Sequence, residues 1–242
     1  MAKRHSVAGI VLAAGSSTRM GRNKLLLKVA GETLVRRAVR VSMEAGLDPV
    51  VVVTGHARER IEREIADMGC TPVFNADHGA GIQTSAASGV AGVAGACDAA
   101  VVMLADMPFV TARMLRTLVE RYAGDAPPLV VSRYGGEVNA PPMLYDQALF
   151  GEVTRMRAGC GREVVRRHYD RAVQVDWPAA WLRDLDRPED YEAVVEEFAG
   201  PGSDAAEERE RSGAGAAEGA EELAQPGADA AEGADGASGE RN

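Results

Sequence analysis

The amino-acid sequence predicts an α/β fold, a doubly wound and mostly parallel sheet with helices on both faces. Two observations predict it. Short apolar runs rich in β-branched residues recur along the chain, and longer segments with helical spacing of apolar residues separate several of them. The chain of 242 residues is long enough for one such domain with a sizeable core. We expect this domain over residues 1–200 and a disordered tail over residues 201–242.

Six apolar runs are predicted to form the strands, because each is short and rich in buried-strand residues. They lie at residues 7–12, 50–54, 71–74, 99–104, 129–132 and 172–175. Four amphipathic segments are predicted to form helices, at residues 33–44, 58–68, 82–93 and 112–122. In sheets of this kind ligands bind at the carboxyl ends of the strands. We therefore expect the segments after Leu12 and Leu104 to lie at one edge.

Charge is distributed unevenly along the chain. The formal net charge is -9, and residues 201–242 hold 11 acidic and 3 basic residues. The remaining 25 acidic and 24 basic residues nearly cancel, which argues against a nucleic-acid surface. The tail is rich in Ala, Gly, Glu and Asp and has one leucine, so burial cannot offset the entropy of ordering it. It is a passive extension, a solubility device or a docking tail.

Cysteine usage and apolar segments bear on the cellular compartment. Cys70, Cys97 and Cys160 lie far apart without the paired spacing of a zinc site, which is typical of a reduced cytosolic protein. No apolar run approaches the ~20 residues that cross a membrane, and no signal-peptide core follows Met1. We expect a soluble, cytoplasmic protein with neither a membrane nor a nucleic-acid partner.

A glycine-bearing loop follows the first predicted strand and reads Leu-Ala-Ala-Gly-Ser-Ser-Thr-Arg-Met-Gly-Arg-Asn-Lys from Leu12. Gly15 and Gly21 allow close approach of the main chain to phosphate oxygens, and Arg19 and Lys24 add positive charge. This pattern predicts a triphosphate cradle. The glycine spacing excludes a Walker loop and a dinucleotide fingerprint. The alternative is an ordinary β-to-α turn with two solvated cations.

Carboxylates follow the strand predicted at residues 99–104. Asp106 comes directly after it, and Pro108 stiffens the turn. A triphosphate binds with Mg²⁺, which takes oxygen ligands and is usually held by one or two carboxylates. Asp184 and Asp186 are predicted to lie on one side of a strand end before a helix near Pro188, so either could complete the metal site. Helix capping is the alternative role of Asp186.

Three ordered motifs resemble the nucleotidyltransferases of the molybdenum-cofactor type, and most of all the molybdenum cofactor cytidylyltransferases. They are the segment from Leu12 to Leu27, the segment Leu-Ala-Asp-Met-Pro ending at Pro108, and Asp-Leu-Asp-Arg-Pro-Glu-Asp-Tyr from Asp184. The likeness covers about residues 7–195. It implies a Rossmann-like nucleotidyltransferase fold.

Carried over position by position, the resemblance assigns Arg19 and Lys24 to the triphosphate. It assigns Asp106 to Mg²⁺ and Asp186 to a second metal contact, which makes Arg19, Lys24 and Asp106 the catalytic candidates. Small side chains at Ala14 and its neighbour leave room for a base against the backbone.

The same resemblance implies a nucleotide-binding set, formed by Leu12, Ala13, Ala14, Gly15, Arg19, Lys24, Gly81 and Ser85. Ala13 and Ala14 are similar to the cytidine form of the loop, because relatives that use GTP tend to have glycine in place of Ala14. Gly81 and Ser85 are the expected base contacts. The alternative for Ser85 is an exposed position at a helix start.

The sequence departs from the cytidylyltransferase pattern where the acceptor would bind. Relatives usually read Gly-His-Pro-Val-Leu-Phe where this chain reads Asn-Ala-Pro-Pro-Met-Leu-Tyr from Asn139, so a histidine is absent. The usual Gly-Asp-x-Gly-Ala-Arg turn is Ala-Gly-Cys-Gly-Arg ending at Arg162, without its acid. His78 is a better substitute than His56, because it adjoins a glycine turn; a surface histidine is the alternative.

The resemblance implies transfer of CMP from CTP to a phosphate-bearing, molybdopterin-type acceptor, with Mg²⁺ and release of pyrophosphate. The product would pass to a transient molybdenum hydroxylase partner of the xanthine dehydrogenase type. Three alternatives remain open. The chain could be a guanylyl- or sugar-phosphate nucleotidyltransferase of the same fold, a non-catalytic cofactor-delivery factor, or a redox relative, although no dinucleotide fingerprint supports the last.

Overall fold

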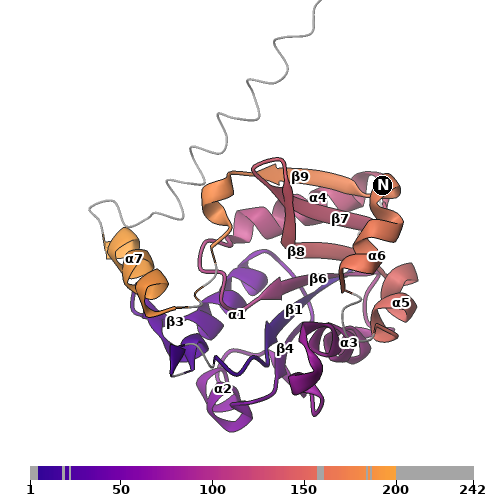
Figure 1. Cartoon of the computed structure of the whole chain (residues 1–242). Coiled ribbons are helices and arrows are strands. Elements are labelled where there is room, and N and C mark those ends of the chain that lie inside the picture. Colours follow the sequence, from indigo (N-terminus) through magenta and orange to yellow (C-terminus); the bar gives the residue numbers. More distant parts are fainter. Residues whose placement is uncertain are drawn as a thin grey trace, which may run out of the picture. The chain divides into compact units, whose positions relative to one another are not determined.

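The computed structural model describes residues 5–17, 20–21, 23–156, 161–183, 185 and 187–199. Within them one sheet is built from β1 (Val7–Ala13), β4 (Val50–Thr54), β5 (Thr71–Phe74), β6 (Ala99–Leu104), β7 (Leu129–Tyr134), β8 (Val138–Asp146) and β9 (Val173–Trp177). A separate hairpin pairs β2 (Lys28–Val29) with β3 (Glu32–Thr33). Figure 1 shows the sheet at the centre of the domain. The predicted tail over residues 201–242 lies outside the described residues.

The strand order of the sheet is β5-β4-β1-β6-β8-β7-β9. The strands β5, β4, β1 and β6 pair in parallel, whereas β8 runs antiparallel to both β6 and β7, and β9 is parallel to β7. The prediction of a mostly parallel sheet is confirmed, and all six predicted runs form strands. The apolar-run criterion does not find β8, because Pro141 and Pro142 interrupt it and its first residues are exposed.

The helices connect the strands. They are α1 (Leu34–Glu44), α2 (Arg58–Glu64), α3 (Ile82–Val93), α4 (Ala112–Asp125), α5 (Phe150–Thr154), α6 (Gly161–His168) and α7 (Pro188–Ala199). Short 3₁₀ turns are η2 (Lys24–Leu26), η3 (His78–Ala80), η4 (Gln147–Leu149), η5 (Tyr169–Arg171) and η6 (Ala179–Trp181). All four predicted helices form, but α2 ends four residues before the predicted bound. No helix among the described residues is long and apolar enough to cross a membrane.

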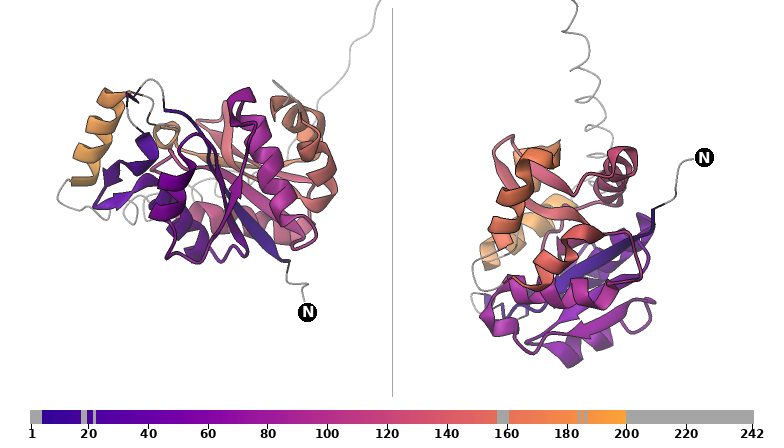
Figure 2. Two further views of the ribbon diagram at one scale, coloured as in Figure 1. Left: turned by 90° about the horizontal axis from the view of Figure 1, so that it is seen from below. Right: turned by 90° about the vertical axis from the view of Figure 1, so that its right-hand side faces the viewer.

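Helices lie against both faces of the sheet (Figure 2). An apolar core lies on each face. Successive side chains of β1 point to opposite faces of the sheet and pack into different cores. Val11 belongs to the core shared with α1 and α4, whereas Ile10 and Leu12 belong to the core shared with α3 and α5. Every residue of β1 is buried. The doubly wound arrangement that the alternation of strands and helices predicts is therefore the one observed.

The segment before α7 differs from the prediction. The expected strand end before Pro188 is wrong for the described residues, because β9 ends at Trp177 and a 3₁₀ turn follows. Leu185 is fully buried in the core under α1 and α4. A buried leucine between two acids imitates the alternation of a strand, which accounts for the error. Asp184 and Asp186 themselves lie outside the described residues.

We expect Gly89→Ala to destabilise the protein, because a Cβ at Gly89 would collide with Ile10 and lie 3.0 Å from Val53 Cγ2. Overpacking costs about 1–3 kcal/mol, against a gain of about 1 kcal/mol in helix propensity, so a net loss of about 1–2 kcal/mol should appear in urea unfolding. In the control Gly124→Ala the added Cβ meets nothing within 4 Å, and stability should rise slightly. Equal stability of the two variants would contradict the close packing of α3 on β1.

Candidate active site

The carboxyl ends of β1 and β6 bring the first two motifs together. Leu12 lies opposite Leu104 in the parallel ladder, and the amide of Ala105 donates to the Leu12 carbonyl at 3.1 Å. The loop after β1 and the turn after β6 therefore leave the sheet side by side. This placement confirms the expectation that both segments lie at one edge of the sheet.

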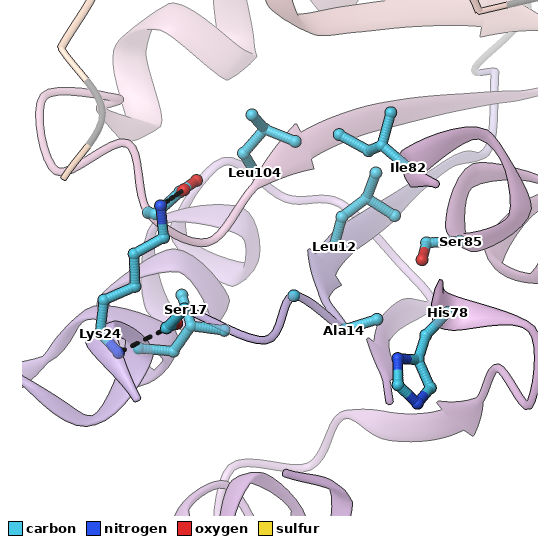
Figure 3. Close-up of a pocket in the computed structure, with 11 residues that line it drawn as sticks. Leu12, Ala14, Ser17, Lys24, His78, Ile82, Ser85 and Leu104 are labelled. Carbon is cyan, nitrogen blue, oxygen red and sulfur yellow. Dashed lines mark hydrogen bonds and ion pairs between the residues drawn. The ribbon is translucent and has the colours of Figure 1, made fainter. Parts of the chain in front are cut away.

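A cavity of about 180 Å³ lies at this edge (Figure 3). Three parts of the chain form its wall: the loop after β1, the turn after β6, and the segment that leads into α3. The lining residues are Leu12, Ala14, Gly15, Ser17, Lys24, Leu25, His78, Ile82, Ser85, Leu104 and Asp106. In Figure 3, Lys24 lies at one end of this group, whereas Ile82, Ser85 and His78 lie together at the other.

Lys24 and Asp106 form an ion pair at the first end of the cavity. Lys24 Nζ lies 2.6 Å from Asp106 Oδ2, and the side chains are 13% and 17% exposed. The local fold places the lysine: its backbone amide donates to Ser17 Oγ at 3.2 Å, and Asn23 Oδ1 accepts from the amide of Leu25 to start η2. Two of the three predicted catalytic residues thus meet. Arg19, the third, lies outside the described residues.

The loop after β1 presents Leu12, Ala14 and Gly15 to the cavity. The side chain of Ala13 instead packs into the core on the opposite face of the sheet, with 3% of its surface exposed. Gly55 packs closely against Ala14 of this loop. A Cβ at Gly55 would lie 2.8 Å from both the Cβ and the carbonyl oxygen of Ala14. The amide of His56 also donates to that carbonyl at 3.3 Å. These contacts hold the small residue Ala14 against the cavity.

Ser85 lines the second end of the cavity and is only 4% exposed. The alternative of an exposed serine at a helix start is therefore not what the structure shows. Gly81 is not among the lining residues; it precedes α3 with φ of 118°, a conformation that favours glycine. The prediction that Gly81 and Ser85 contact a base stays a prediction, although the structure brings only Ser85 to the wall.

Several lining residues escape sequence reasoning. Ser17, Ile82 and Leu104 line the cavity, although none of them is among the binding residues predicted from the sequence; Ser17 and Leu104 lie inside the first two motifs. Ile82 is 56% exposed, and its position directly after a glycine turn is the one signal that could have found it. His78 also lines the cavity, with its ring 6.2 Å from that of His56.

The segment that departs from the family pattern forms β8. Ala140 and Pro141, in the segment that lacks the family's histidine, are half-buried and are not part of the cavity wall. Tyr145 is packed between the core under α3 and α5 and a smaller core around Leu129. Burial raises the pKa of the Tyr145 phenol to about 12, so it remains neutral at physiological pH. Tyr145 is also not among the residues that line the cavity.

A family model described as the MobA-like NTP transferase domain matches residues 9–173. The chain belongs to this family. The match begins in β1 and includes the whole cavity wall described above. The resemblance that the three motifs indicate is thereby confirmed at the level of the family.

Curated relatives of this MobA-like transferase have different names. It is 44% identical over 107 residues, 44% of this chain and 51% of the relative, to "Probable molybdenum cofactor guanylyltransferase" of Opitutus terrae. The chain thus spans about half the length of that protein. It is 30% identical over 201 residues, 77% of this chain and 94% of the relative, to "Purine catabolism protein PucB" of Bacillus subtilis.

Solved structures with the same fold include Rv0371c of Mycobacterium tuberculosis. Its TM-score is 0.70 at 27% identity, with 79% of this chain and 98% of that chain covered. A second structure of Rv0371c is a complex with manganese, and it has a TM-score of 0.65 at 26% identity over 79% and 98% of the two chains. The MobA-like transferase therefore has a fold seen in a metal-bound relative.

A double-mutant cycle tests the ion pair of the MobA-like transferase. Because Lys24 and Asp106 are largely withdrawn from solvent, Lys24→Met and Asp106→Asn should show a favourable coupling of about 1–3 kcal/mol in urea unfolding. The control pair, Arg58 and Glu62 on α2, is more exposed at 51% and 25%, so Arg58→Met and Glu62→Gln should couple by about 0.3–0.5 kcal/mol. Equal couplings would mean that solvent screens both pairs alike.

Proposed function

We propose that this chain transfers CMP from CTP to a phosphate-bearing acceptor, with molybdopterin as the acceptor and with release of pyrophosphate. One observation carries the proposal: a lysine and an aspartate from two distant motifs meet at the carboxyl end of a parallel sheet, beside a cavity. Membership of a nucleoside triphosphate transferase family supports the reaction type. The cytoplasm, where CTP is available, is the proposed location.

Asp106 fits a magnesium ion that arrives with a triphosphate. Its carboxylate is a hard oxygen ligand that faces the cavity, and such ions keep most of their ligands from phosphate and water. No group of three or more candidate ligands occurs in the described part of the chain, and one or two carboxylates suffice for this kind of site. Bound there with the proposed second ligand Asp186, Mg²⁺ would neutralise charge on the phosphates.

Lys24 stabilises the phosphates in the proposed mechanism. Its ammonium carries three donors on a flexible stem, so it can turn from Asp106 to an oxygen of a bound triphosphate without leaving the cavity. That movement also frees the Asp106 carboxylate. Lys24 then favours the departure of pyrophosphate by offsetting its negative charge, with Arg19 as the second cation.

The reaction needs no nucleophile from the protein. An oxygen of the acceptor phosphate attacks the α-phosphorus of CTP, a new P–O bond forms, and the bond between the α-phosphorus and the bridging oxygen of pyrophosphate breaks. Both reactants are anionic, so the work of the chain is to align them and offset their charge. The loop with Leu12, Ala14 and Gly15 and the contact at Ser85 would orient the nucleotide.

The form of the loop supports CTP over GTP. Ala14 lines the cavity, and the family resemblance links alanine at this position to the cytidine form of the loop. The second candidate is guanylyl transfer, favoured by the name of the Opitutus terrae relative. The donor experiment below separates these two functions.

Molybdopterin is supported by the family and by the name of that relative. The name of the Bacillus subtilis relative concerns purine catabolism, and xanthine is a purine. Delivery of the product to a molybdenum hydroxylase of the xanthine dehydrogenase type is part of the proposal because the family resemblance implies it. A delivery factor without turnover is favoured by the absence of the family histidine from residues 139–145, and it would bind CTP without releasing pyrophosphate.

A panel of nucleoside triphosphates tests the donor. With Mg²⁺ and molybdopterin, CTP should give the highest kcat/KM for pyrophosphate release, about 10-fold or more above GTP, because the base must fit beside Ala14. Omission of molybdopterin is the control and should abolish the signal. Preference for GTP would establish the second candidate instead, and binding of CTP without pyrophosphate release would establish the delivery role.

Asp106→Ala should lower kcat by about 100-fold or more while the protein stays folded, because the carboxylate proposed to hold Mg²⁺ is lost. Pyrophosphate release and circular dichroism measure the two properties. Asp67→Ala is the matched control, since Asp67 is an exposed carboxylate paired with Arg36 outside the cavity wall. Retained turnover in Asp106→Ala would refute the assignment.

A further inference from the structure

Asn75 lies directly behind Ser85 and outside the cavity wall. It follows β5, where its backbone amide donates to the Thr54 carbonyl at 2.9 Å and continues the ladder between β4 and β5. The residue is 3% exposed. Its side-chain amide donates to Ser85 Oγ at 3.0 Å and to Thr84 Oγ1 at 2.9 Å, both in the first turn of α3.

The orientation of the Asn75 amide is determined by its neighbours. The backbone amide of Asp77 can only donate, and it lies 3.0 Å from Asn75 Oδ1. The carbonyl oxygen of the Asn75 side chain therefore faces Asp77, and the NH₂ group faces the two hydroxyls. Rotation of the amide by half a turn would place two donors against each other.

The two hydroxyls use their protons differently. Thr84 Oγ1 lies 2.8 Å from the Gly81 carbonyl and 3.0 Å from the Asp77 carbonyl, so its single proton is occupied inside the turn before α3. Ser85 Oγ accepts from Asn75, and among the described residues it donates no hydrogen bond. Because an acceptor lone pair of Ser85 already faces Asn75, its proton points away from Asn75, and the serine lines the cavity (Figure 3).

We propose that Asn75 is a positioning residue for nucleotide recognition: its side-chain amide holds Ser85 as a hydrogen-bond donor toward the base. The inference rests on the proposed function and extends it to a residue that has no contact with the cavity. It also defines the ligand chemistry, because a donor at this place needs an acceptor on the base edge. The carbonyl oxygen of a pyrimidine such as cytosine provides one.

The experiment separates recognition of the base from recognition of the phosphates. Calorimetry with Mg²⁺ measures affinity for CTP and for inorganic triphosphate in the full-length wild type, Asn75→Asp, Ser85→Ala and the double variant. Asn75→Asp keeps the size and the acceptor for Asp77, but the NH₂ donor becomes a carboxylate oxygen that would attract the Ser85 proton. Asn75→Ala removes the donor without adding charge and is measured in parallel, in case the carboxylate prevents folding.

We expect each single variant to bind CTP about 10-fold more weakly, as for one lost hydrogen bond in a buried site, with unchanged affinity for inorganic triphosphate. The double variant should lose no more than Ser85→Ala alone, because Asn75 acts through Ser85. Thr84→Val is the matched control: it removes the other hydroxyl that Asn75 touches and should leave the ratio of the two affinities at the wild-type value.

Several results would overturn the inference. Equal loss of CTP and inorganic triphosphate in Asn75→Asp would show a merely structural role, and an additive double variant would show that Asn75 acts independently of Ser85. If the wild type transfers CMP normally and the Asn75 variants bind CTP as it does, the positioning role alone fails. A wild type that binds inorganic triphosphate as well as any nucleoside triphosphate would remove the proposed function as well.

Discussion

The parallel pairing of β1 with β6 is the constraint on which the site depends. It sets Leu12 opposite Leu104, and the hydrogen bond from Ala105 to Leu12 extends the pairing past the end of the strand. Only through this register do Lys24 and Asp106 come within 2.6 Å. A slip of one residue would exchange the two buried faces of β1, so packing of both helical layers protects the register.

The cavity has two ends of different physical character. One end presents the opposite charges of Lys24 and Asp106, which suit a triphosphate and its metal. The other end is neutral, with Ala14 and Ile82 as apolar surface and the hydroxyl of Ser85 as a polar group. The hydrogen bond from Asn75 to Ser85 and the close packing of α3 on the sheet hold the residues of this end in place. Charge therefore governs one half of the site, and shape with hydrogen bonding governs the other.

The segment of residues 139–145, which departs from the family pattern, lies in β8. The antiparallel strand β8 joins the two halves of the sheet and contains the altered segment with Ala140. Its tyrosine, Tyr145, is not among the residues that line the cavity. Relatives named for a guanylyltransferase and for purine catabolism are similar in sequence to this chain over 107 and 201 residues.

The sequence by itself determined the α/β class, the six apolar strands, the sheet edge where the first two motifs lie and the charged residues Lys24 and Asp106, because burial of apolar runs and charge at strand ends are local signals. It wrongly predicted a strand end before Pro188, where Leu185 is instead buried by packing against residues far along the chain. Only the tertiary structure decided that β8 joins the sheet, that Ala13 faces the core, and that Asn75 orients Ser85. These properties depend on contacts between residues distant in sequence, and no local pattern records which side chains will meet.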